Sequence, residues 1–145
     1  MTTTTKTPWH LWTIGAAMLL WGGLSGYDYV MSVTVGTPYL RASGMTPAQV
    51  AYFTTLPIWV SLAWTASVWG FALAGLALVL RRAVATPLLA TSLTGTLAYI
   101  LWTCLLSDGI AAMGAMWFMP ALVAAITAVL IAYTWRLRRL AVLNT

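Results

Sequence analysis

Long apolar runs separated by short polar segments dominate the pattern of this chain. Four runs are long enough to cross a bilayer as helices, because about 20 apolar residues span its hydrocarbon core. They cover approximately residues 9–31, 58–80, 84–106 and 110–135. Tryptophan and tyrosine residues gather near the ends of these runs, as aromatic residues do at membrane interfaces. The pattern predicts an all-α integral membrane four-helix bundle, formed as a single transmembrane domain over residues 1–145.

The connection before the second run has a helical pattern of its own. Thr46 followed by Pro47 is typical of a helix start, and the apolar residues Val50 and Phe53 follow at helical spacing. Pro57 removes a helix hydrogen bond, so we expect a bend there. The sequence therefore predicts a short helical outer loop before the second span.

The connection between the third and fourth runs is short and contains Ser107 and Asp108. Either side chain suits the N-cap of a helix, where a carboxylate also meets the positive end of the helix dipole. Pro120 lies inside the fourth run. We expect it to bend the fourth helix about one third of the way along.

Composition identifies the solvent of this chain as lipid. Hydrophobic residues make up 61% of it and charged residues 6%, and the mean hydropathy is +0.89. A soluble domain carries about a quarter charged residues. We expect membrane lipids as partners, together with other membrane-protein subunits or further copies of the chain. Nucleic acid is not expected, because the basic residues separate the apolar runs and form no patch.

The basic residues also predict how the bundle is oriented. With four spans, six of the seven basic residues share one side of the membrane and Arg41 lies on the other. The six are Lys6, Arg81, Arg82, Arg136, Arg138 and Arg139. Basic residues favour the cytoplasmic side. Both termini are therefore predicted to be cytoplasmic, and the first run is interpreted as an uncleaved span.

The two acidic residues, Asp28 and Asp108, both fall on the predicted outer side. An ionisable residue in a span suggests a functional site by default. The functional hypothesis is an outer polar pocket formed by Tyr27, Asp28, Tyr29, Arg41 and Asp108. The alternative, which the sequence favours, is structural: Asp28 pairs with Arg41 or holds the outer loop, and Asp108 caps a helix.

Small residues recur at spacings that let membrane helices approach closely. Gly15, Gly22 and Gly26 share one face of the first predicted helix, and Ala66 and Gly70 lie on the second. We expect these residues to pack the helices of one bundle together, with the glycine face of the first helix against Ala66 and Gly70.

The residues that could support chemistry are few. Met113, Met116 and Met119 recur every three residues, and thioethers are soft ligands suited to Cu(I). Methionine also fills apolar helices, and this interpretation is favoured, so no metal site is predicted. The single His10 and the single Cys104 exclude a two-histidine metal site and an internal disulfide within one chain. We predict no cofactor, no catalytic residues and no enzymatic activity.

Three stretches resemble a family of small proteobacterial membrane proteins that is loosely labelled "sugar transporter": TPWHLWTIGAAMLLWGGLSGYDYVM, MTPAQVAYFTTLPIWVSLAW and LLSDG. The resemblance covers nearly the whole chain. It implies a multi-pass, four-span protein of the bacterial inner membrane. It implies no catalytic or substrate-binding residues.

Three functional classes fit this sequence. The favoured one is a non-catalytic accessory or structural subunit that associates with a larger membrane complex, docking through exposed tryptophans such as Trp64 and Trp69. The second is a small-solute transporter or binding protein, with a sugar-like ligand in the outer pocket. The third is a Cu(I)-handling membrane protein.

Overall fold

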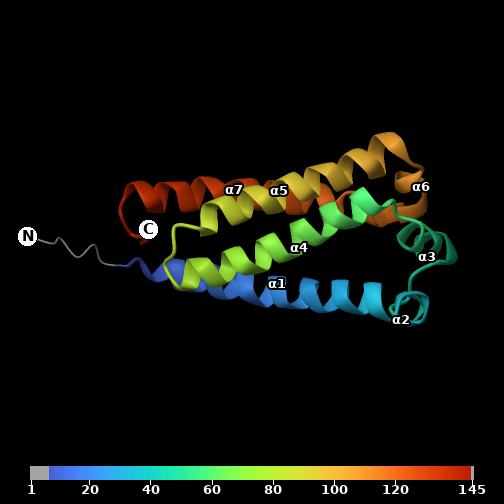
Figure 1. The fold of residues 1–145 in the computed structure, drawn as a ribbon, viewed down its shortest axis with the longest axis horizontal. Coiled ribbons are helices and arrows are strands. Elements are labelled where there is room, and N and C mark those ends of the chain that lie inside the picture. The colour runs from blue at the N-terminus through green and yellow to red at the C-terminus, as the bar shows by residue number, and fades with distance from the viewer. Residues whose placement is uncertain (1–6, 145) are drawn as a thin grey trace, which may run out of the picture.

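The computed structural model describes residues 7–144, and its regular elements in this range are helices (Figure 1). Four long helices lie side by side, with three short helices at one end of the bundle. The long helices are α1 (Trp9–Thr34), α4 (Ile58–Val79), α5 (Ala85–Leu101) and α7 (Met119–Arg139). The short ones are α2 (Thr37–Ala42), α3 (Pro47–Thr54) and α6 (Gly109–Met113), and a 3₁₀ turn covers Gly114–Met116.

Three helices within residues 7–144 are long and apolar enough to cross a membrane: Ile58–Val79, Ala85–Leu106 and Met119–Arg139. The second of these includes a π-helix, Trp102–Leu106, which continues α5. The all-helical membrane character predicted from composition is therefore confirmed. Helix α1 has 26 residues but mixes glycine, serine, threonine and Asp28 with its apolar residues. A membrane crossing by α1 stays a prediction.

The long helices pack in chain order. Helix α1 packs on α4, α4 on α5, and α5 on α7. Helices α1 and α7 are joined near the start of α1, where a hydrogen bond of 2.7 Å links His10 Nδ1 to the Tyr133 hydroxyl. The first turn of α1 and the last turn of α7 therefore lie at the same end of the bundle (Figure 1).

The glycine face of α1 lies against α4, because small residues allow the two backbones to approach. A Cβ atom added at Gly22 would lie 2.8 Å from the Cα of Ala72. Gly15 faces Val79, and Gly26 lies under the Trp69 ring. From the other side, Gly75 of α4 meets the backbone of α1 beside Met18. The α1–α4 contact is therefore a seam of close backbone approach.

The expected pairing of this face with Gly70 is wrong, and a contact of Ala66 with α1 stays a prediction. A Cβ atom at Gly70 would lie 3.0 Å from the carbonyl oxygen of Leu88 and the amide nitrogen of Ser92, so Gly70 faces α5. The face of α4 that meets α1 instead carries Ala72 and Gly75. Helix α4 has small residues on two sides, and sequence spacing alone does not show which side meets which neighbour.

Prolines begin helices in this fold. Pro57 is the N-cap of α4, so α3 and α4 are separate helices and not one bent helix. Pro120 lies in the first turn of α7, so the expected bend inside that helix is absent. A proline fits the first turn because its missing N–H would be unpaired there in any case. Thr46 and Gln49 form the capping box that starts α3.

The end that carries Arg81, Arg82, Arg136, Arg138 and Arg139 is called the basic end below, and the end with α2, α3 and α6 is called the loop end. The main core cluster lies towards the basic end and contains the fully buried Leu11, Leu78 and Leu89. The chain after α7 folds back over it: the Asn144 N–H donates to the Arg81 carbonyl at 2.6 Å, and the Ala83 N–H to the Asn144 carbonyl at 2.8 Å. Lys6 lies outside the described residues.

Candidate functional site

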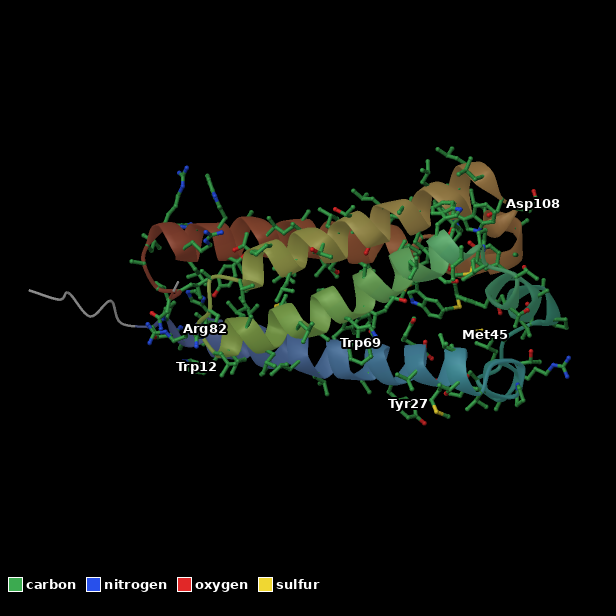
Figure 2. The ribbon with its side chains drawn as sticks, viewed as in Figure 1. Trp12, Tyr27, Met45, Trp69, Arg82 and Asp108 are labelled. Atoms are coloured by element: carbon green, nitrogen blue, oxygen red, sulfur yellow. The ribbon has the colours of Figure 1, made fainter. Side chains whose placement is uncertain are left out.

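A cavity of about 430 Å³ lies towards the loop end, between the long helices. All four long helices contribute to its wall, together with Met45, Phe53 and residues 113 and 116 of the short elements. Met45 marks its loop end in Figure 2. Small-molecule sites in proteins have volumes of roughly 300–1,000 Å³. The cavity is therefore large enough for a small organic ligand.

Asp28 is the acidic group of this cavity, and it stands in a row of polar residues on α1. Ser25, Asp28 and Ser32 all line the cavity, because residues three and four apart share one helix face. The Tyr39 hydroxyl of α2 donates a hydrogen bond of 2.7 Å to Asp28 Oδ1. This bond raises the pKa of Tyr39 above its ordinary value, since the carboxylate favours the neutral, donating phenol; partial desolvation acts in the same direction.

Three hydroxyls form a closed network on the opposite wall, between α4 and α5. The Thr96 hydroxyl donates to the Ser92 carbonyl at 2.9 Å, and the Ser92 hydroxyl donates to the Ser67 carbonyl at 2.7 Å. The Ser67 and Thr96 hydroxyl oxygens are 2.6 Å apart. Because the Thr96 hydrogen is already used, Ser67 is the donor in that pair. All three hydrogens are used inside the wall, and Ser92 and Thr96 are buried there, so this wall offers no hydroxyl donor to a ligand.

Aromatic rings supply much of the remaining wall. Trp21, Phe53, Trp64 and Tyr99 all line the cavity. The Trp64 ring packs edge-on against Tyr29, with ring centroids 5.1 Å apart. Trp64 is half-buried, so the expectation that it is exposed is wrong, whereas Trp69 is exposed. Docking of a partner through these tryptophans stays a prediction.

The methionines singled out in the sequence meet at this cavity. Met113, Met116 and Met119 all line it, and Met45 joins them from the connection between α2 and α3. The amide of Gln49 donates to the Met113 carbonyl at 3.2 Å and so ties α3 to α6. Residues 7–144 contain no group of three His, Cys, Asp or Glu side chains placed to hold a metal ion. The methionine cluster adds flexible, polarizable surface to the site.

The structure does not gather the five residues of the hypothetical outer polar pocket in one place. Asp28 lines the cavity, whereas Tyr27 is 61% exposed and packs its ring 6.5 Å from that of Tyr39. The Tyr29 hydroxyl hydrogen-bonds to Thr65 at 2.5 Å and so joins α1 to α4. Tyr27 and Asp108 lie on opposite sides of the bundle (Figure 2).

The expected ion pair of Arg41 with an acid is also wrong for the part of the chain that the structure describes. Arg41 is exposed on α2, and the partner that reaches Asp28 is Tyr39, two positions earlier. Asp108 occupies the N-cap position of α6, but its side chain makes no capping hydrogen bond. The Ser107 hydroxyl accepts the Gly109 N–H instead, at 3.2 Å.

The π-helix places a further polar contact beside the cavity, and sequence reasoning did not find it. Thr103 of this segment is buried and donates to the Tyr99 carbonyl at 2.9 Å. It also hydrogen-bonds to the Tyr52 hydroxyl of α3 at 2.8 Å. The nearest sequence signal is the row of hydroxyl residues at positions 92, 96 and 103 in an apolar run. These contacts hold α3 over the loop end.

A second hollow of about 600 Å³ lies at the basic end. The charged residue in its wall is an arginine, whereas that of the loop-end cavity is the acid Asp28. The wall of the second hollow includes His10, Tyr133 and Arg136, and no acid occurs among the described residues that line it. The two hollows therefore suit ligands of different charge.

Comparisons of this chain with protein-family models, with curated proteins and with solved structures gave no match. The geometry of the loop-end cavity is accordingly the basis for a functional proposal.

Proposed function

We propose that this chain is a non-catalytic integral membrane protein that binds a small molecule in its loop-end cavity, as a carrier or a binding protein. The observation that supports this proposal is the cavity itself. It is lined from all four long helices and combines Asp28 and a hydroxyl wall with apolar and aromatic surface. A few polar groups in a mainly apolar hollow are typical of small-molecule sites.

The proposed orientation places the basic end in the cytoplasm of a bacterial cell, with the loop end outside. Five arginines of the described residues lie at the basic end, and Arg41 lies at the loop end. Positive residues favour the cytoplasmic side of the inner membrane. A C-terminal alkaline phosphatase fusion should be inactive. An active fusion would contradict this orientation.

Binding is tested with a neutral aromatic probe, triphenylphosphine oxide, by equilibrium dialysis against the purified protein in dodecyl maltoside micelles. The protein should take up more probe than empty micelles do. Val68→Phe should lower this uptake at least tenfold, because Val68 lines the cavity and the larger ring fills it. Val129→Phe is the matched control, since Val129 is 69% exposed on α7. Uptake equal to that of empty micelles would overturn the proposal.

The second candidate is the accessory subunit of a larger membrane complex. The face of α1 that points away from the bundle favours the accessory role. Ala16 and Gly23 are exposed on this face, and an added Cβ at Gly23 would meet no atom within 4 Å. Small residues on an open helix face permit close approach of another protein helix, whereas lipid fits such a groove poorly. Helix α1 is also less apolar than the three candidate spans.

This candidate predicts a large heteromeric assembly after gentle extraction from the native membrane, observed by native mass spectrometry. Gly23→Leu should release the protein from that assembly without unfolding it. A wild-type protein that runs as a monomer or homo-oligomer would exclude the accessory role.

A further inference from the structure

We propose that the ligand of the loop-end cavity is an organic monocation with an apolar, aromatic body, and that Asp28 supplies the opposite charge. This inference rests on the proposed small-molecule binding and specifies the class of the ligand. Three features of the cavity support it: an acid without a basic partner, a hydroxyl wall with no hydrogen left to donate, and aromatic rings around the same space.

The first feature is charge. Asp28 is the acid of the lining, and the described residues around the cavity include no Lys, Arg or His. Its Oδ1 accepts the hydrogen bond from Tyr39, while no hydrogen bond within residues 7–144 reaches Oδ2. A carboxylate near hydrocarbon is costly when no cation compensates it. A bound cation supplies the charge that Arg41 does not.

The second feature is the direction of the hydrogen bonds in the α4–α5 wall. Ser67, Thr96 and Ser92 donate to one another or to backbone carbonyls. No hydroxyl hydrogen of this wall is left for a ligand, and Ser92 and Thr96 are buried. An anion would therefore face Asp28 without a hydroxyl donor from this wall, so the cavity disfavours an anion.

The third feature is the apolar surface. Trp21, Trp64, Phe53 and Tyr99 lie in the wall, and cations are attracted to the faces of aromatic rings by about 0.5–2 kcal/mol in general. Four methionines complete this surface. Flexible thioether side chains adapt to ligands of different shape. The site is therefore suited to a class of bulky cations and not to one rigid molecule.

The test compares three probes of similar shape and different charge on the wild-type protein. They are tetraphenylphosphonium, neutral triphenylphosphine oxide and tetraphenylborate, each measured by equilibrium dialysis in dodecyl maltoside against empty micelles. Tetraphenylphosphonium should bind at least tenfold more tightly than the neutral probe, and tetraphenylborate should bind more weakly than both. This comparison needs no variant, so it does not depend on how a substitution affects folding.

A matched pair of variants assigns the preference to one carboxylate. Asp28→Asn keeps the size of the side chain and an acceptor for Tyr39, and should lower tetraphenylphosphonium affinity about tenfold. Asp108→Asn removes the other acid of the chain, which is exposed and outside the cavity lining. It should leave tetraphenylphosphonium affinity within twofold of the wild type.

The outcomes separate this inference from the function on which it rests. Neutral and cationic probes binding equally well would overturn the monocation and leave small-molecule binding in place. Equal losses in the two Asp→Asn variants would also overturn the role of Asp28. No uptake of any probe above empty micelles would overturn both proposals.

Discussion

The two ends of this bundle differ in how their side chains pack. At the basic end, Leu11, Leu78 and Leu89 are fully buried in the core cluster, and the chain after α7 is held to the α4–α5 connection by backbone hydrogen bonds. At the loop end, the helices surround a half-open cavity lined by Asp28, hydroxyl residues, aromatic rings and methionines. The basic end combines a packed core with the hollow beside His10 and Arg136, and the loop end is built around a cavity that has an acid in its wall.

This difference shows how a small helical bundle can combine a packed core with a cavity. Close packing supplies the contacts that keep helices together in lipid, and the main buried cluster of this bundle lies towards the basic end. Side-chain hydrogen bonds such as those from Tyr39 to Asp28 and from Tyr29 to Thr65 connect the elements around the hollow. Stability and binding are therefore expected to respond to substitutions at different ends.

The largest expected effect is at the backbone seam between α1 and α4. Gly75→Leu should destabilise the protein by about 3 kcal/mol, because a Cβ added there would lie only 3.0 Å from that of Met18 and 3.2 Å from the Leu19 amide nitrogen. Gly23→Leu is the control and should change stability by less than about 0.5 kcal/mol. Both are measured by chemical unfolding in dodecyl maltoside. Equal losses of stability in the two variants would show that the α1–α4 contact is no more sensitive to an added side chain than the exposed face of α1.

Truncating a core side chain tests whether the two ends of the bundle are packed differently. Leu78→Ala at the packed end should cost about 2 kcal/mol, since its side chain is 0% exposed and its removal leaves an unfilled space. Met116→Ala at the hollow end should cost less than about 0.5 kcal/mol, because Met116 is 47% exposed. The same unfolding assay ranks them. A larger loss for Met116→Ala would reverse the assignment of core and hollow.

A smaller effect is expected where α1 and α7 join. Tyr133→Phe removes the hydroxyl that hydrogen-bonds to His10 but keeps the edge-on ring contact, with centroids 5.6 Å apart. The expected loss is about 1 kcal/mol. Tyr27→Phe, at an exposed ring, should leave the unfolding midpoint unchanged. If both variants match the wild type, the hydrogen bond between α1 and α7 contributes nothing measurable.

The smallest effect is a pH dependence at the loop end. The hydrogen bond to Asp28 raises the folded-state pKa of Tyr39. A raised pKa means that its contribution to stability is fully present below the unfolded value of about 10. This contribution is lost as pH rises through the folded-state pKa. The stability difference between wild type and Tyr39→Phe should therefore shrink above pH 10 in thermal unfolding. A difference that stays constant to pH 12 would contradict this linkage.

Local features of the fold were accessible from the sequence. Thr46 and Pro47 mark the start of α3, and the second and third apolar runs correspond closely to the candidate spans Ile58–Val79 and Ala85–Leu106. The fourth run was expected from residue 110, but α7 begins at Met119. Residues 109–116 are mostly apolar, so the hydropathy pattern did not separate them from the span that follows. Pro120 sets the start of α7 because a proline fits the first turn of a helix.

The candidate site was accessible only in part. Asp28 drew notice because a charge in an apolar run is costly, and the three methionines because of their spacing. Their convergence with Met45, and the hydroxyl network of Ser67, Ser92 and Thr96, required the fold. The choice of Tyr39 over Arg41 as the partner of Asp28 depends on how α2 turns back over α1. No local rule specifies that geometry.

The class of this protein follows from its sequence, since composition and the length of the apolar runs demand helices in lipid. The sequence also specifies where several helices begin, because caps and prolines act over one helical turn. The tertiary structure alone decided which faces meet. Lipid-facing and protein-facing sides of a membrane helix are both apolar, so hydropathy does not fix how each helix is rotated about its axis. That rotation placed Gly70 against α5, turned Trp64 inward and left Asp28 facing a cavity without a basic partner.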